Sequence, residues 1–195
     1  MRIVAFDQSV TASAAVVLDS VDSNRIKPSA YLTCKPKSTG VYRYLELKEW
    51  IERVIKEKAP DLIAREMHNQ IQFGAASQIQ VVGGMIDIAA RTHLHGDWYV
   101  IIPVTVWKKV LTGKGNLKKD TAYLIKIYEA LRGSMLFESP LKFESMDDNI
   151  ADAMCIGVVA YAAKRARDGN FSGLRSAEEV VIKKNLDMMF DYGKK

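Results

Sequence analysis

Cysteine is scarce in this chain, which has only Cys34 and Cys155 among its 195 residues. The two lie far apart in the sequence, neither belongs to a C-x-x-C pair, and no pair of histidines stands near them. A structural zinc site needs several closely spaced cysteines or histidines, and a disulfide framework needs several cysteines. The sequence therefore predicts neither, and it favours a reducing, intracellular setting.

Long hydrophobic runs are also missing. The opening residues, MRIVAFDQSV, lack the apolar core of a secretory signal, and no run approaches the roughly 20 residues that cross a bilayer. We therefore expect no membrane partner. The 48% of hydrophobic residues is enough to form a substantial core, and the length suits one compact domain better than two.

Positive charge is concentrated in one region. The net charge is +5, and residues 101–132 contain seven basic side chains against two acidic ones. The basic residues are Lys108, Lys109, Lys114, Lys118, Lys119, Lys126 and Arg132. This surplus matches that of the whole chain, so a single region would attract an anionic partner.

Short apolar runs bounded by polar or turn-forming residues predict five β-strands. These runs cover residues 2–7, 13–18, 30–34, 62–66 and 98–102. The first two runs flank a short polar turn, which is typical of a hairpin. The run over residues 62–66 follows a strand and a helix, so we expect it to pair in parallel with the first strand.

Apolar residues at helical spacing predict the helices. They cover residues 41–58, 73–92, 104–111, 118–131 and 147–167, and a terminal helix begins at Ser176. The helix over residues 147–167 is acidic in its first turns and basic in its last, as the helix dipole favours. The order of elements predicts an α/β fold with a five-stranded mixed sheet flanked by α-helices.

Two acidic residues stand at the carboxyl ends of apolar strands. Asp7 ends the first strand, and Glu66 ends the strand over residues 62–66. A buried carboxylate is costly unless it is paired or coordinates a metal, although such an aspartate can also cap the following turn. Parallel strands bring their carboxyl ends to one edge of a sheet, where ligands bind. We therefore expect Asp7 and Glu66 to converge.

A second group of acids opens the helix over residues 147–167. Asp148 and Asp152 are about 40° apart around this helix, and Asn149 and Asp152 are about 60° apart, so these three share a face. Asp147 points elsewhere and suits the helix dipole. Asp152 lies deeper, among apolar neighbours, where the dipole does not explain it. Oxygen ligands from several carboxylates suit Mg²⁺ or Mn²⁺.

These features, in this order, resemble the RuvC family of Holliday junction resolvases. The resemblance spans residues 1–164. It rests on the strand ending in Asp7, the strand ending in Glu66, the segment PVTVWKKVLTGKGNLKK of residues 103–119, and the helix start DNIADA of residues 148–153. It implies an RNase H-like nuclease domain over residues 1–170, followed by a C-terminal helical extension over residues 171–195.

The resemblance also implies an activity. The expected enzyme is a Mg²⁺-dependent crossover junction endodeoxyribonuclease that cuts four-way DNA junctions in recombination and repair, with Mn²⁺ as a substitute. Asp7, Glu66 and Asp152 match the family's metal ligands, and we expect two ions in each active site. Lys108 and Lys119 match basic residues that contact DNA near the cut, and we expect Lys119 to take part in catalysis.

Two departures from the family pattern affect these assignments. Gln8 and Ser9 stand where bacterial members usually have proline and glycine, which suggests a divergent, phage-type member in the cytoplasm of a bacterial or phage-infected cell. The family's last two carboxylates usually form an i, i+3 pair, which places Asn149 rather than an acid opposite Asp152. Asp148 lies on the same face, so we expect it to be the fourth ligand, with Asn149 as the alternative.

Further candidate DNA contacts lie near these positions. Lys109, Lys114 and Lys118 belong to the basic segment. Phe73 corresponds to a region where the family places an aromatic residue at the branch point, but it could equally pack beneath the helix that follows. His68 could contact the scissile phosphate, although an exposed loop histidine is the simpler interpretation.

The glycine-containing stretch TGKGN of residues 112–116 superficially resembles a phosphate loop. It lacks the full spacing of a nucleotide-binding loop and has no Ser or Thr after its lysine, so we expect no nucleotide cofactor. A glycine loop that presents lysine to the DNA backbone is the better interpretation.

A four-way junction presents two equivalent strands, so a two-fold symmetric enzyme would place one active site on each. We therefore expect a homodimer, built partly on the helix over residues 73–92. Its small residues permit close approach of a neighbour, which is either another subunit or part of the same one. They include Gly83, Gly84, Ala89 and Ala90.

Other functions share part of this pattern. Transposase and integrase cores use similar acids but usually come with added DNA-binding domains. An actin-like ATPase needs glycines directly after its first aspartate, and residues 8–14 contain none. A non-catalytic branched-DNA-binding protein of the same fold, or an RNase H-like nuclease acting on other branched DNA, stays open as an alternative.

Overall fold

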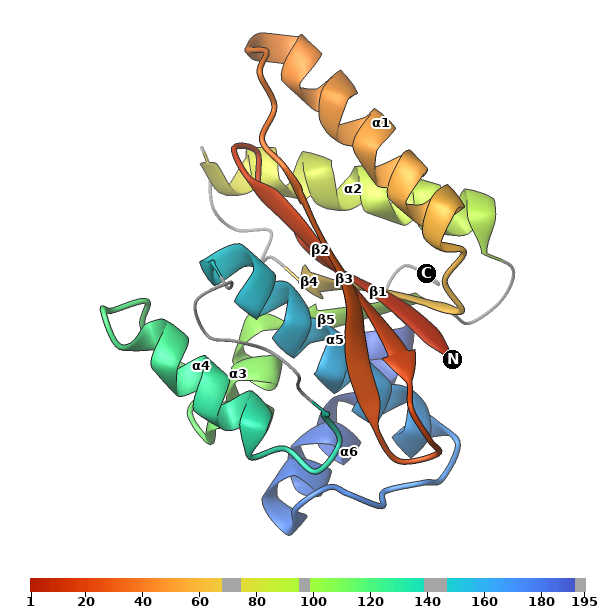
Figure 1. Ribbon diagram of the computed structural model, residues 1–195, viewed down its shortest axis with the longest axis vertical. Helices are drawn as coiled ribbons and strands as arrows, with labels where there is room; N and C mark the ends of the chain where they lie inside the picture. Colours follow the sequence, from red (N-terminus) through yellow and green to blue (C-terminus); the bar gives the residue numbers. More distant parts are fainter. Residues whose placement is uncertain (68–74, 95–98, 139–146, 192–195) are drawn as a thin grey trace.

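One sheet organises the chain, and the computed structural model describes residues 1–67, 75–94, 99–138 and 147–191 (Figure 1). Within these residues five strands pair in the order β3-β2-β1-β4-β5. The strands are β1 (Arg2–Asp7), β2 (Ser13–Ser20), β3 (Ile26–Cys34), β4 (Leu62–Met67) and β5 (Tyr99–Pro103). β2 is antiparallel to β1 and β3, whereas β4 is parallel to β1 and β5. The predicted mixed sheet is confirmed, including the parallel pairing of β4 with β1.

Helices cover both faces of the sheet. Within the described residues they are α1 (Gly40–Lys58), α2 (Ala75–His93), α3 (Val104–Thr112), α4 (Tyr123–Arg132), α5 (Asp148–Arg167) and α6 (Ser176–Asp191). α1 and α2 lie side by side against one face, and α5 crosses the other face with α3, α4 and α6 around it (Figure 1).

Two apolar cores follow from the alternation of side chains along each strand. Val4, Phe6 and Ile63 pack toward α1 and α2. Ile3, Ala5, Leu62 and Ala64 pack toward α5 and its neighbours. α5 comes unusually close to the sheet at Gly157, where a Cβ atom would overlap the Leu18 side chain. The central helix is therefore seated tightly over β1 and β2.

The helix predicted over residues 118–131 begins later, at Tyr123. The Asp120 carboxylate accepts a hydrogen bond from the backbone N–H of Ala122, and the Asp120 carbonyl accepts one from Tyr123, so the chain turns before the helix starts. Lys118 and Lys119 consequently lie in a non-helical segment. The prediction was wrong there because a local aspartate turn competes with the helix for the same backbone groups.

The other predicted elements are found with small shifts. β3 starts at Ile26 rather than at residue 30, and β2 extends to Ser20. Asp147 caps α5, since its carboxylate accepts from the Ile150 N–H at 2.8 Å. Residues 73, 74 and 98, with which one predicted helix and one predicted strand began, lie outside the described residues.

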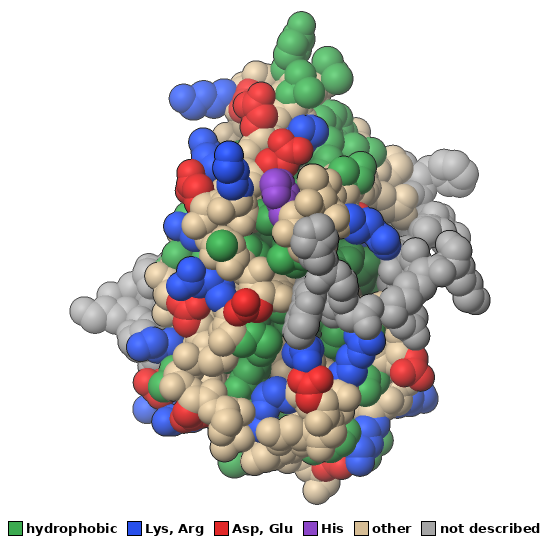
Figure 2. Space-filling view, turned by 90° about the vertical axis from the view of Figure 1, so that its right-hand side faces the viewer, with side chains coloured by type: hydrophobic (Ala, Val, Ile, Leu, Met, Phe, Trp, Pro, Cys, Tyr) green, Lys and Arg blue, Asp and Glu red, His purple; other side chains and the backbone are tan. Residues whose placement is uncertain are grey.

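Some hydrophobic side chains stay exposed. At the start of α1, Val41 and Tyr42 are each 66% exposed. Figure 2 shows hydrophobic side chains gathered at the top of the molecule, where Figure 1 places the start of α1. In the part of the chain that is described, no helix combines the length and apolar character needed to span a membrane.

Candidate active site

Three buried acids meet where β1, β4 and α5 come together. Asp7 lies two residues after Ala5 on β1, and Glu66 lies two residues after Ala64 on β4. Because side chains two residues apart on a strand share a face, both acids face α5, as Ala5 and Ala64 do. The pairing of Phe6 with Arg65 brings the carboxyl ends of the two strands to the same level of the sheet. Asp152 is contributed by the second turn of α5. The predicted convergence of Asp7 with Glu66 is confirmed, and Asp152 joins them.

The three carboxylates are almost entirely removed from solvent. Asp7 is 8% exposed, Glu66 7% and Asp152 4%. Burial raises the pKa of Asp7 well above its ordinary value, and the nearby charges of Asp152 and Glu66 raise it further. Burial also raises the pKa of Glu66 to about 7. Among the described residues, none donates a hydrogen bond to the Asp7 carboxylate. The cluster is therefore short of positive charge and suits a cation.

Asp152 is held by two donors. The Lys119 ammonium lies 2.7 Å from its Oδ2, and the Tyr123 hydroxyl donates to its Oδ1. Burial raises the pKa of Asp152, and the Lys119 charge only partly offsets this effect. Lys119 also lies over the Tyr123 ring, with 5.5 Å between Nζ and the ring centroid. The non-helical segment before α4 is what lets Lys119 reach α5.

Glu66 is fixed at both its carboxylate and its main chain. The indole N–H of Trp107 donates to Oε1 at 2.8 Å. The Gln8 amide donates to the Glu66 carbonyl at 2.7 Å, while its own buried oxygen has no partner among the described residues. Sequence reasoning missed Trp107, Tyr123 and Gln8. Buried Trp and Tyr side chains usually have hydrogen-bond partners, and this general rule is the only sequence signal that could have identified Trp107 and Tyr123.

The hydrogen-bond donors around the acids also affect whether the site can bind a metal ion. In the ranges covered by the structure, no three Asp, Glu, His or Cys side chains are grouped closely enough to hold one metal ion. Both oxygens of Asp152 are engaged by Lys119 and Tyr123. The donor set is chemically right for Mg²⁺ or Mn²⁺, because it consists of buried carboxylates with excess negative charge. A divalent ion at Asp152 would compete with the Lys119 ammonium for the same carboxylate.

The two candidates for the fourth ligand lie in the first turn of α5. Asp148 and Asn149 are both half-buried. Burial lowers the pKa of Lys119, but the charges of Asp152, Asp7 and Asp148 outweigh it and raise the pKa overall. Asp148 is thus close enough to act on Lys119. The choice between Asp148 and Asn149 stays a prediction.

Lys108 is the second lysine near the acids. Its ammonium donates to the Leu117 carbonyl at 3.1 Å and lies 5.3 Å from the Trp107 ring centroid. Its charge lowers the pKa values of Glu66 and Asp152 slightly against the larger effect of burial. Lys108 therefore lies beside the acidic cluster, and its contact with DNA stays a prediction.

The remaining predicted DNA contacts are less closely tied to the acids. Lys109, Lys114 and Lys118 are exposed side chains of α3 and the segment after it. His68 and Phe73 lie outside the described residues.

The comparisons with known proteins concern the fold. No protein-family model matches the chain, and no curated protein sequence matches it. Among solved structures, RuvC of Thermus thermophilus in complex with a Holliday junction substrate is 18% identical, with a TM-score of 0.65 over 87% of this chain and 96% of that one. The fold is that of RuvC.

Two further structures agree. Another T. thermophilus RuvC structure is 19% identical, with a TM-score of 0.63 over 87% of this chain and 97% of that one. The Holliday junction resolvase of fowlpox virus is 13% identical, with a TM-score of 0.52 over 84% of this chain and 99% of that one. The expected RNase H-like fold of the RuvC resolvases is confirmed.

Proposed function

We propose that this chain is a structure-selective DNA endonuclease that resolves four-way junctions by metal-dependent hydrolysis of phosphodiesters. The observation that supports it most is the convergence of Asp7, Glu66 and Asp152, three buried acids from separate elements, beside two lysines. The RuvC fold and the junction bound to one similar structure favour four-way DNA as the substrate.

Carboxylates would hold the metal. Asp7, Glu66 and Asp152 would be ligands, with Asp148 as the fourth and Asn149 as its alternative. A bound divalent ion supplies the Lewis acid for phosphodiester hydrolysis, and two ions in one site can act on both reacting oxygens. Mg²⁺ suits this oxygen-rich set, and Mn²⁺ can substitute.

The chain's own residues prepare the site. Trp107 holds the Glu66 carboxylate, and Tyr123 holds that of Asp152, so both are oriented before DNA binds. Lys119 forms an ion pair with Asp152, and its side chain is 45% exposed. We propose that it turns from Asp152 toward the scissile phosphate and neutralises charge there. Lys108, Lys109, Lys114 and Lys118 would contact the neighbouring backbone.

A cleavage assay tests this function. The full chain is incubated with Mg²⁺ and labelled four-way, Y-shaped and linear DNA of matched length and sequence. We expect paired nicks in the four-way junction, none in linear DNA, and no cutting after Mg²⁺ is removed with EDTA. Cutting of the Y-shaped DNA alone would replace junction resolution with a nuclease for other branched DNA.

A non-catalytic branched-DNA-binding protein is the second candidate. The engagement of both Asp152 oxygens by Lys119 and Tyr123 favours it, because the Lys119 ammonium already supplies a positive charge where an ion would bind. Tight junction binding without nicking, in Mg²⁺ and in Mn²⁺, would establish this alternative.

We further propose that the chain acts as a homodimer through α2. Val81 is 49% exposed and Ile88 66%, so this helix presents apolar side chains to solvent. A Cβ at Gly84 would meet nothing within 4 Å, which leaves room for a close partner. Ala89 and Ala90 are instead buried within the same subunit. The proposed dimer surface on α2 therefore includes fewer of the small residues than the sequence pattern predicted.

A further inference from the structure

A buried arginine lies directly behind Glu66, on the opposite face of the sheet. The Arg65 side chain is 8% exposed and points toward α2. Its Nε lies 2.6 Å from Oδ1 of Asp87 in α2, and its Nη2 donates to Oδ2 at 2.9 Å. The same Nε lies 2.6 Å from the Tyr99 hydroxyl of β5, which donates to Asp87. The guanidinium thus joins α2 and β5 to β4.

The same guanidinium also holds the main chain of Glu66. Nη1 of Arg65 donates to the Glu66 carbonyl at 2.7 Å. The pairing of β4 with β1 ends at Arg65, so side chains rather than a strand satisfy this carbonyl on the β1 side. Gln8 supplies the other donor at 2.7 Å. The position of the Glu66 backbone therefore depends on how Arg65 is held.

The local sequence makes room for this arrangement. A Cβ at Gly83 would lie 3.3 Å from both Cζ and Nη1 of Arg65. A Cβ at the next residue, Gly84, would meet no atom within 4 Å. Burial lowers the pKa of Arg65, but its contacts with Asp87 and Tyr99 outweigh burial and raise that pKa overall.

We propose that Asp87 and Tyr99 are positioning residues, which act through Arg65 to set the Glu66 carboxylate for metal binding. This inference rests on the proposed function, since it assigns Glu66 to a metal. The carboxylate emerges on the α5 face, while the network that fixes its backbone lies on the α2 face. Partners that orient a ligand typically change metal affinity by about 10- to 100-fold when removed.

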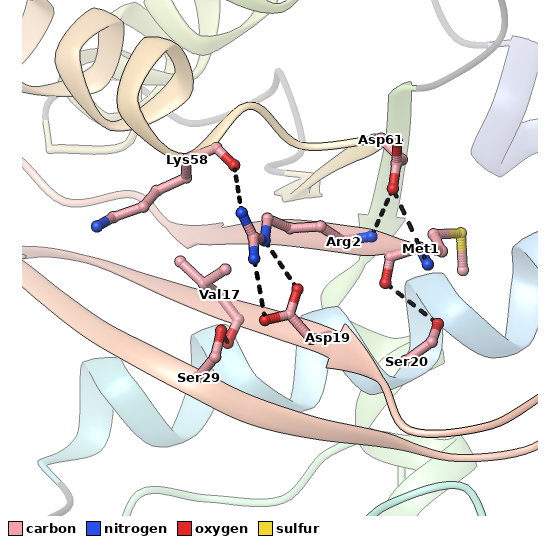
Figure 3. Close-up of polar contacts among 8 residues, drawn as sticks. All are labelled: Met1, Arg2, Val17, Asp19, Ser20, Ser29, Lys58 and Asp61. Carbon is pink, nitrogen blue, oxygen red and sulfur yellow. Dashed lines mark hydrogen bonds and ion pairs between the residues drawn. The ribbon is translucent and has the colours of Figure 1, made fainter.

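The opposite end of the sheet provides a matched control. Nε of Arg2 lies 2.8 Å from Oδ1 of Asp19, and the Asp19 side chain is 27% exposed, against 28% for Asp87. Arg2 also donates to a main-chain carbonyl, that of Lys58 (Figure 3). Asp19→Asn therefore removes the same kind of ion pair away from the acids, although Arg2 is 45% exposed and Arg65 is 8% exposed.

The experiment measures Mn²⁺ affinity of the full-length chain without DNA, from the free Mn²⁺ signal in electron paramagnetic resonance. We expect Asp87→Asn to weaken the affinity by about 10-fold or more, and Tyr99→Phe to weaken it less, whereas Asp19→Asn leaves it unchanged. Equal affinities for Asp87→Asn and Asp19→Asn would overturn the positioning role.

Two further variants keep the test valid if Asp87→Asn does not fold. Gly83→Ala presses on Arg65 without removing a hydrogen-bonding group, and Gly84→Ala makes the same helix substitution in open space. We expect only Gly83→Ala to weaken Mn²⁺ binding. Equal Mn²⁺ affinities of these two variants would also overturn the proposal.

Failure of the proposed function gives a different result. If the unaltered chain binds no Mn²⁺, or if Glu66→Gln binds it as well as the unaltered chain, the metal site itself is wrong. If Glu66→Gln loses binding while Asp87→Asn does not, the site stands and only the positioning role falls.

Discussion

At the scale of single residues, the proposed function assigns Asp7 and Glu66 to a metal ion, and both carboxylates are buried and negatively charged, so neither should bind the DNA backbone. We expect Asp7→Asn and Glu66→Gln to abolish cleavage of a four-way junction while binding of the junction survives. Gel-shift and nicking assays on the same preparations separate the two effects. Asp61→Asn, an exposed aspartate at the other end of β4, is the control. Full Mg²⁺-dependent cutting by either site variant would remove that residue from the site.

The identity of the fourth ligand can be tested by comparing neighbours. If Asp148 is the ligand, Asp148→Asn should lower the rate of cleavage far more than Asn149→Ala, because only the first removes a charge from the cluster. Single-turnover rates with saturating protein measure this difference. The reverse ranking would assign the position to Asn149.

The raised pKa of Glu66 makes the metal-free chain sensitive to pH. Its value of about 7 lies above the ordinary 4.5, so folding favours the protonated carboxyl. That contribution to stability is complete below about 4.5 and is lost as the pH rises through about 7. The loss is at most roughly 3 kcal/mol. Urea unfolding in EDTA should show stability falling over this range, with a flatter curve for Glu66→Gln. Parallel curves for the two proteins would contradict the shift.

At the scale of elements, the segment between α3 and α4 decides what the lysines can reach. Because residues 118–122 are not helical, Lys119 extends to α5. We expect Lys108→Ala and Lys119→Ala to slow cleavage and to flatten the salt dependence of junction binding by about one unit of slope per lost phosphate contact.

Lys48→Ala is the control for this measurement, because Lys48 is exposed on α1 and pairs with Glu52. Its slope and its cleavage rate should match those of the unaltered chain. If Lys108→Ala and Lys119→Ala behave like Lys48→Ala, the two lysines form only a solvated surface.

At the scale of the whole molecule, resolving a four-way junction requires cuts in two equivalent strands, and a two-fold symmetric dimer would place one active site on each. We expect a two-fold dimer at micromolar concentration, and Ile88→Glu should weaken it because the charge would be buried in the α2 interface. Sedimentation velocity with and without junction DNA measures the state. Tyr42→Glu, an exposed apolar position on α1, is the control. A monomer under both conditions would exclude the dimer and the paired-nick mechanism.

The sequence by itself determined the local elements and the positions of the acids. Alternating apolar residues defined β1 and β4, and an acid at the end of each strand required Asp7 and Glu66 to share an edge once the strands were parallel. Helical periodicity likewise placed Asp148, Asn149 and Asp152 on one face of α5. Each element could be inferred because strand and helix geometry relates residues only a few positions apart. The convergence of Asp7 with Glu66 followed from the parallel pairing of β1 and β4.

Tertiary structure decided which side chains surround those acids. Tyr123 meets Asp152, Trp107 meets Glu66, and Arg65 joins Asp87 to Tyr99 across separate elements. No periodic pattern relates such residues, since each contact depends on how α2, α3 and α4 pack on the sheet. Sequence periodicity also failed at short range before α4. Residues 118–122 fit a helical pattern, but the hydrogen bond from the Ala122 N–H to the Asp120 carboxylate forms a turn there instead. The sequence therefore determined where the acids lie, and the packing of the helices on the sheet determined which side chains contact them.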